Sequence, residues 1–94
     1  MELIPLNPTI RQNLRLSAKV EGVVVADVQA GSEAARRGIQ DGDVIVGVNN
    51  QPVKSPAEMR RLFDDARKQG RRYAMVQIAR QNEVAFLTLP TSEK

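Results

Sequence analysis

The chain has 94 residues, 41% of them hydrophobic, and a formal net charge of +3. This length suits one domain with a modest core and is too short for a second. The absence of cysteine and histidine excludes disulfides, thiolate or imidazole metal ligands, and Ser-His or Cys-His nucleophilic pairs.

Basic and acidic residues are interleaved along the chain, and its one tyrosine and two phenylalanines give nucleobases little to stack on. Nucleic acid is therefore not expected as a partner. No apolar run approaches the roughly 18 residues that a membrane-spanning helix needs, so direct membrane insertion is not expected either.

The first predicted elements are an extended piece over Glu2–Leu6 and a short helix after it. Pro5 lacks a backbone N–H donor, so it is tolerated in a strand only where no hydrogen bond to a neighbouring strand is needed. Asn7 or Thr9 can begin a helix that runs to Leu14.

The next predicted strand, Gly22–Val28, is rich in β-branched residues and has no polar alternation before Asp27. This pattern predicts a strand in mid-sheet that is buried on both faces.

A short helix with its stop signal and a tight turn follow within Gly31–Ile45. Ser32 can cap the helix, Gly38 can take the left-handed conformation that ends it, and Ile39 can fold back as the hydrophobic contact. Gly42-Asp43 makes the next turn and leads into a predicted strand over Asp43–Val48. Turn geometry explains four residues of this segment, and we interpret them as fold residues: Gly31, Gly38, Gly42 and Asp43.

The second half begins with a turn at Asn49-Asn50, which suits positive backbone angles, and a brief return strand over Gln51–Val53. A helix over Pro56–Lys68 is predicted next, because Ser55 can cap it and Glu58 completes a capping box.

Two alternating segments, Tyr73–Ala79 and Glu83–Leu89, predict a final hairpin, and residues 91–94 are expected to form a polar, frayed tail. The predicted class is α+β and mainly β: a partly open barrel or sandwich of five or six strands, capped by one long helix and one or two short ones.

The sequence resembles bacterial, circularly permuted PDZ domains, and most of all those of the HtrA/Deg periplasmic serine proteases. The resemblance covers residues 1–90 and rests on Gly22-Val23-Val24-Val25, Ala30-Gly31-Ser32 with Gly38-Ile39, Gly42 to Asn49, and Ser55 to Leu62. It implies a non-catalytic module that binds extended, hydrophobic C-terminal peptides by strand addition between the Met1–Leu6 edge and the Pro56–Lys68 helix.

On that helix, Pro56, Arg60 and Phe63 share the face toward the implied groove, and Met59 lies on the adjoining face, which is expected to be mostly core. Phe63 would line the pocket for an apolar terminal side chain, and Arg60 at the rim would favour acidic residues upstream. In the alternative interpretation, Phe63 only fills core and Arg60 is a solvated charge. The candidate peptide-binding residues are Met1, Glu2, Leu3, Ile4, Pro56, Met59, Arg60 and Phe63.

The family places an apolar-Gly-apolar loop for the peptide carboxylate just before this edge strand, and Met1 falls where the residue after that glycine would be. The carboxylate site is therefore expected to be incomplete. The resemblance further implies a periplasmic location, a parent serine endopeptidase, no cofactor and no metal. The implied partners are protein C-termini, misfolded proteins and other protomers of the parent.

An alternative function is an assembly domain that docks another subunit or a secretion or membrane component. Catalysis by this chain is not expected, because its only close carboxylates, Asp64-Asp65 and Asp41 with Asp43, lack the opposed geometry of an acid and base pair.

Overall fold

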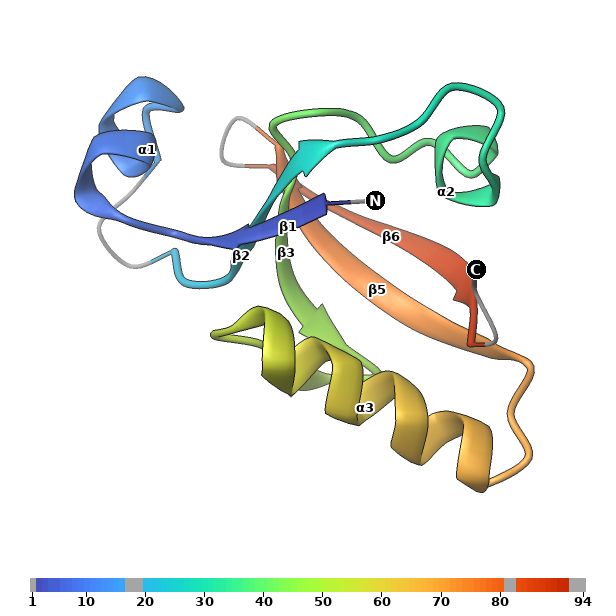
Figure 1. The fold of residues 1–94 in the computed structure, drawn as a ribbon. Coiled ribbons are helices and arrows are strands. Elements are labelled where there is room, and N and C mark those ends of the chain that lie inside the picture. The colour runs from blue at the N-terminus through green and yellow to red at the C-terminus, as the bar shows by residue number, and fades with distance from the viewer. Residues whose placement is uncertain (1, 17–19, 81–82, 92–94) are drawn as a thin grey trace.

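A computed structural model describes residues 2–16, 20–80 and 83–91 as one antiparallel sheet with three helices (Figure 1). The strands follow the order β1-β2-β3-β5-β6, and the short β4 pairs with β3. This mainly-β architecture, with one long and two short helices, confirms the predicted fold class. The elements are β1 (Glu2–Pro5), α1 (Pro8–Asn13), β2 (Val23–Asp27), α2 (Glu33–Arg36), β3 (Val44–Val48), β4 (Gln51–Pro52), α3 (Pro56–Lys68), β5 (Tyr73–Arg80) and β6 (Glu83–Pro90).

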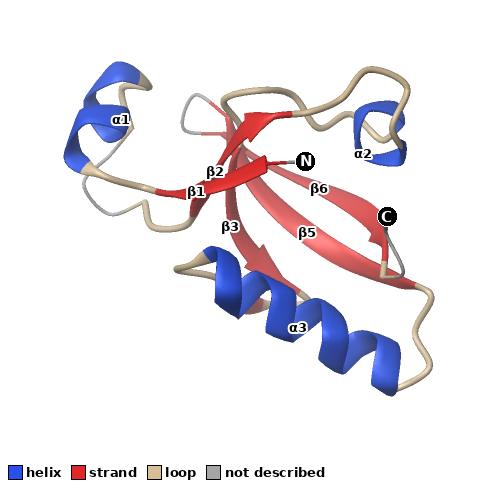
Figure 2. Ribbon diagram, in the orientation of Figure 1, coloured by secondary structure: helices blue, strands red, loops and turns tan. Residues whose placement is uncertain are grey.

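The main core lies on the face of the sheet that α3 covers. Directly paired residues share a face, so the cross-strand register places Val23, Ile45, Ile78 and Ala85 in one row across four strands. Met59 and Leu62 of α3 join the same buried cluster. Figure 2 shows the three helices set around the strands, with α1 and α2 on opposite sides of the molecule.

The opposite face carries a second, smaller cluster. Its row runs from Ile4 through Val24, Val44 and Ala79 to Val84, each residue paired with the next. Apolar side chains of α1 and its flanks cover the first four positions of this row, and Val84 is exposed. The helix is capped by Asn7, whose side chain accepts from the backbone of Ile10 at 2.8 Å. Of the two predicted caps, Asn7 and Thr9, the structure uses Asn7.

Local signals act as predicted around α2. Ser32 Oγ accepts from the backbone N–H of Ala35 at 3.2 Å, and Gly38 ends the helix with φ at +101°. The N–H of Gly38 bonds to Ala35 and that of Ile39 to Ala34, each at 3.1 Å, which is the Schellman pattern. Ile39 is consequently buried.

The β3–β4 turn also follows the sequence signal, because Asn49 and Asn50 both have positive φ. The Asn49 side chain adds a tertiary role: its Oδ1 accepts from the backbone N–H of Met75 at 2.9 Å, and its own N–H donates to the Met75 carbonyl at 2.8 Å. Gly22 is required by a close approach at the start of β2, where a Cβ would lie 2.2 Å from the Ile45 carbonyl oxygen.

Two expectations need correction. The predicted strand Gly22–Val28 is buried only through Val25. β2 pairs with β3 at Val23 and Val24, and the Val25 backbone bonds to Asp43 and Gly42 just before β3, whereas the rest of β2 lies past these contacts and is exposed. Thr91, expected in the polar tail, is only 5% exposed, and its hydroxyl donates to the Arg71 carbonyl at 2.8 Å. Residues 92–94 lie outside the described part of the chain. Among the residues described, no helix has the length and apolar character needed to cross a membrane.

Candidate functional site

Strand β1 forms one edge of the sheet and pairs only with β2 among the described strands. The register runs from Glu2 opposite Asp27 to Pro5 opposite Val23, with an irregularity between Glu2 and Leu3. The other side of β1 therefore presents backbone donors and acceptors that no described strand satisfies.

The candidate residues on β1 divide between the two faces of the sheet. Leu3 is half-buried and packs against the main core, on the face that α3 covers. Ile4 packs into the second cluster on the opposite face, so its side chain points away from α3. Glu2 is exposed, and Met1 lies outside the described residues.

Helix α3 is fixed at its first turn by two reciprocal hydrogen bonds. Ser55 Oγ accepts from the Glu58 backbone N–H at 3.1 Å, and Glu58 Oε1 accepts from the Lys54 backbone N–H at 2.8 Å. The predicted capping box thus forms, with its return bond at Lys54, one residue before the cap. Pro56 occupies the first helical turn, where its missing N–H costs nothing.

The candidate residues on α3 differ in burial. Met59 is 4% exposed and belongs to the main core. This agrees with the expectation that its face of the helix is mostly core. Phe63 is partly buried and packs against the same core, while Arg60 is exposed and Pro56 intermediate. Helix α3 also approaches β1, and Leu3 of β1 and Phe63 of α3 pack against the same core.

An extended segment placed along the open side of β1 could pair with its backbone and set alternate side chains toward α3. The arrangement therefore offers an extended polypeptide both backbone pairing and an apolar contact surface. Within the described ranges, no three acidic side chains converge as metal ligands.

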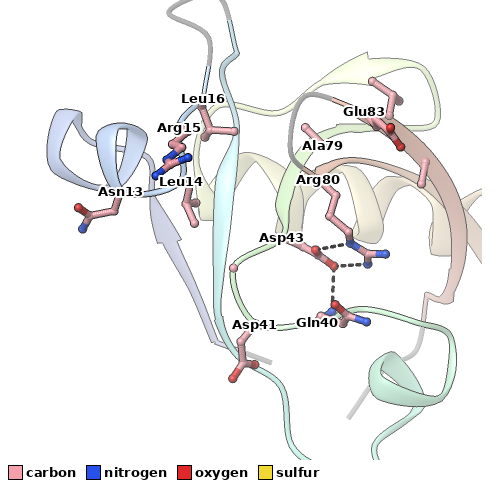
Figure 3. A pocket seen from close by; sticks show the side chains of 13 residues that line it. Asn13, Leu14, Arg15, Leu16, Gln40, Asp41, Asp43, Ala79, Arg80 and Glu83 are labelled. Carbon is pink, nitrogen blue, oxygen red and sulfur yellow. Dashed lines mark hydrogen bonds and ion pairs between the residues drawn. The ribbon is translucent and has the colours of Figure 1, made fainter.

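The most buried ionic contact lies away from this edge, beside the turn before β3. Asp43 is 2% exposed, and its carboxylate accepts two bonds from Arg80, at 2.7 and 2.6 Å, and one from the Gln40 backbone N–H at 2.9 Å (Figure 3). Arg80 also donates to the Gly38 carbonyl at 2.8 Å. The Asp43 carboxylate raises the pKa of Arg80 above its ordinary value, chiefly by hydrogen bonding.

These contacts give Asp43 the scaffold role predicted for it and add a partner that sequence reasoning missed. Arg80 is 37 residues away in the chain, so no local signal marked it. The ion pair between Asp43 and Arg80 joins the loop between α2 and β3 to the end of β5.

Similarity to known proteins agrees with this arrangement. The sequence model of the PDZ domain family matches residues 24–70, which is half of the chain. A probable periplasmic serine endoprotease, DegP-like, of Brucella suis is 42% identical over 74 residues, covering 79% of this chain and 14% of the relative. The periplasmic serine endoprotease DegP of Salmonella typhimurium is 54% identical over 44 residues, covering 47% of this chain and 9% of the relative. The chain thus spans at most about one seventh of these relatives' length.

Solved structures share the fold. The HtrA3 PDZ domain bound to a phage-derived ligand, FGRWV, superposes with a TM-score of 0.73 at 24% identity, over 96% of this chain and 79% of that one. The HtrA-type protease AlgW with a decapeptide gives a TM-score of 0.67 at 26% identity, over 95% of this chain and 26% of that one. Together with the family match, these likenesses show that the chain belongs to the PDZ domain family.

Proposed function

We propose that this chain is a non-catalytic peptide-binding and regulatory module of an HtrA-like serine protease of the periplasm, and that it binds extended C-terminal segments at β1. The observation that carries the proposal is the open edge of β1, paired on one side only and flanked by α3. Two solved relatives support it, because the HtrA3 PDZ domain and the AlgW protease were each determined with a peptide.

Binding proceeds by strand addition. The backbone of the peptide pairs with Glu2–Pro5, and its last apolar side chain lies between Leu3 and Phe63, which both pack against the main core. Met59 is buried in the same core and supports this part of α3. Arg60, exposed on the same helix near Pro56, favours acidic residues earlier in the peptide.

We infer that its ligands are free protein C-termini, including those of misfolded chains. Affinities of isolated modules of this kind are expected on the order of 1 to 100 µM, or about −5 to −8 kcal/mol. In the parent protease, such binding would present substrates or report their presence to the catalytic part.

The test is a fluorescence-anisotropy titration with hydrophobic peptides, each made as a free acid and as a C-terminal amide. Because the carboxylate site is expected to be incomplete, we expect the free acid to bind more tightly than the amide by less than about tenfold, or about 1.4 kcal/mol. Equal affinity for both forms would refute recognition of the chain end, and no binding to either would refute the site.

A matched pair of variants uses the only two phenylalanines of the chain. Phe63→Leu should weaken the free-acid peptide several-fold while circular dichroism stays native, whereas Phe86→Ala, on β6 at the other end of the sheet, should leave affinity unchanged. The reverse pattern would place the binding site elsewhere.

A further inference from the structure

The exposed large hydrophobic side chains of the described residues all lie on the β5–β6 hairpin. Tyr73 is 50% exposed, Val84 58% and Phe86 57%. The register pairs Phe86 with Gln77 and Val84 with Ala79, so these side chains share one face of the hairpin with Tyr73 and with the partly buried Met75. We call Tyr73, Met75, Val84 and Phe86 the hairpin patch.

The hairpin patch takes no part in the hydrophobic core. None of its four residues belongs to either core cluster. The patch continues the row of the second cluster, which α1 and its flanks cover as far as Ala79 and which then emerges at Val84. Gln77 and Thr88 lie on the same face beside these apolar side chains. Exposed apolar side chains gathered on one face mark an interaction site more often than singly scattered ones do.

Positive charge surrounds the Tyr73 end of the patch. The Arg37 guanidinium lies 4.8 Å from the centroid of the Tyr73 ring and helps to line a hollow of about 400 Å³ with Met75 and Phe86. A second hollow, of about 420 Å³, adjoins Tyr73 and is lined by Arg67, Arg71 and Arg72. Among the residues that the structure describes, no acidic side chain lines either hollow.

Two of these four arginines already have carboxylate partners, since Arg37 lies 2.7 Å from Glu33 and Arg67 lies 2.6 Å from Asp64. Within the described residues, Arg71 and Arg72 have no ion pair. Considering only the described part of the chain, this end of the patch carries positive charge without an acidic partner beside an aromatic ring.

We propose that the hairpin patch is a second docking surface, and that its occupant is an amphipathic helix of a partner protein with acidic residues at the Tyr73 end. The apolar stripe of the helix packs on Met75, Val84 and Phe86, and its carboxylates meet Arg71 and Arg72. From Tyr73 to Val84, which pairs with Ala79, the patch is roughly 20 Å long at about 3.4 Å per residue, which matches a helix of about 14 residues. Helix α1 already covers the adjoining part of the same face.

The probe is a 14-residue amphipathic peptide with a leucine stripe and two glutamates at one end, acetylated and amidated so that it has no free carboxyl terminus. A control peptide replaces the glutamates with lysines. We expect the acidic peptide to bind at least about tenfold more tightly than the control. Amide shifts in nitrogen-15 spectra should cluster at β5 and β6 and leave β1 and α3 unchanged.

Two variants locate the contact. Phe86→Ser and the double variant Arg71→Glu/Arg72→Glu should each weaken the acidic peptide about tenfold, and Arg61→Glu on α3 should leave it unchanged. Phe86→Ser and the double arginine variant should both retain wild-type affinity for the free-acid peptide at β1. Failure of this surface is therefore separable from failure of the proposed peptide site.

Equal binding of the two peptides, or amide shifts at β1 and α3, would overturn the proposal. So would a concentration-dependent dimer in sedimentation that Phe86→Ser abolishes, because the occupant would then be a second copy of this chain. Unchanged binding in both natively folded variants would likewise exclude the patch.

Discussion

Arg80→Met removes the guanidinium beside a buried carboxylate while keeping most of the side-chain length. Asp43, 2% exposed, would retain only the Gln40 backbone N–H. A hydrogen bond to a charged group contributes about 1.5 to 3 kcal/mol, and Arg80 makes two to this carboxylate. Because the Arg80 side chain is itself 40% exposed, water offsets part of the loss. We expect the free energy of unfolding to fall by about 2 to 3 kcal/mol.

Urea denaturation gives this free energy directly, and the melting temperature should fall by roughly 10 to 20 °C for a domain of this size. Arg61→Met is the matched control, because its ion pair with Glu58 is longer, at 3.7 Å, and its side chain is 63% exposed. It should cost less than about 0.5 kcal/mol. A double-mutant cycle with Asp43→Asn isolates the coupling, and a loss in Arg80→Met no larger than in the control would refute the reasoning.

Two further predictions concern backbone contacts. Gly22→Ala places a Cβ 2.2 Å from the Ile45 carbonyl oxygen, so β2 and β3 must separate, and unfolding in urea should show a loss of about 3 kcal/mol or more; an unchanged midpoint would contradict the close approach. Ser55→Ala removes the acceptor for the Glu58 N–H at 3.1 Å and should cost about 1 kcal/mol in thermal melts, with Ser55→Asp restoring most of it. Equal losses in both Ser55 variants would argue against capping.

The features predicted correctly are those that short-range geometry determines. The Schellman stop at Gly38, the Asn49-Asn50 turn and the Ser55 cap each depend on residues within about one helical turn or one hairpin. The alternation over Tyr73–Ala79 likewise identified the hairpin, because a pattern of period two has one natural pairing when the connection is short.

Features that depend on how distant elements meet were not predictable. The partner of Asp43 is set by where the end of β5 passes the turn before β3. Thr91 is buried because the carbonyls of Arg71 and Arg72 lie beside the end of β6. On β1, sequence placed Leu3 and Ile4 together, whereas the pleat sends them to opposite faces.

The packing of β1 against the rest of the domain depends in part on the small cluster under α1. Helix α1 has no buried residue, and elements with few buried contacts open at lower free energy than the rest of a domain. Ile4 and Leu6 pack into the cluster that α1 completes, so opening of the helix removes the cover from one face of β1. We therefore expect the affinity of the proposed peptide site to include the free energy of keeping the α1 layer packed on β1.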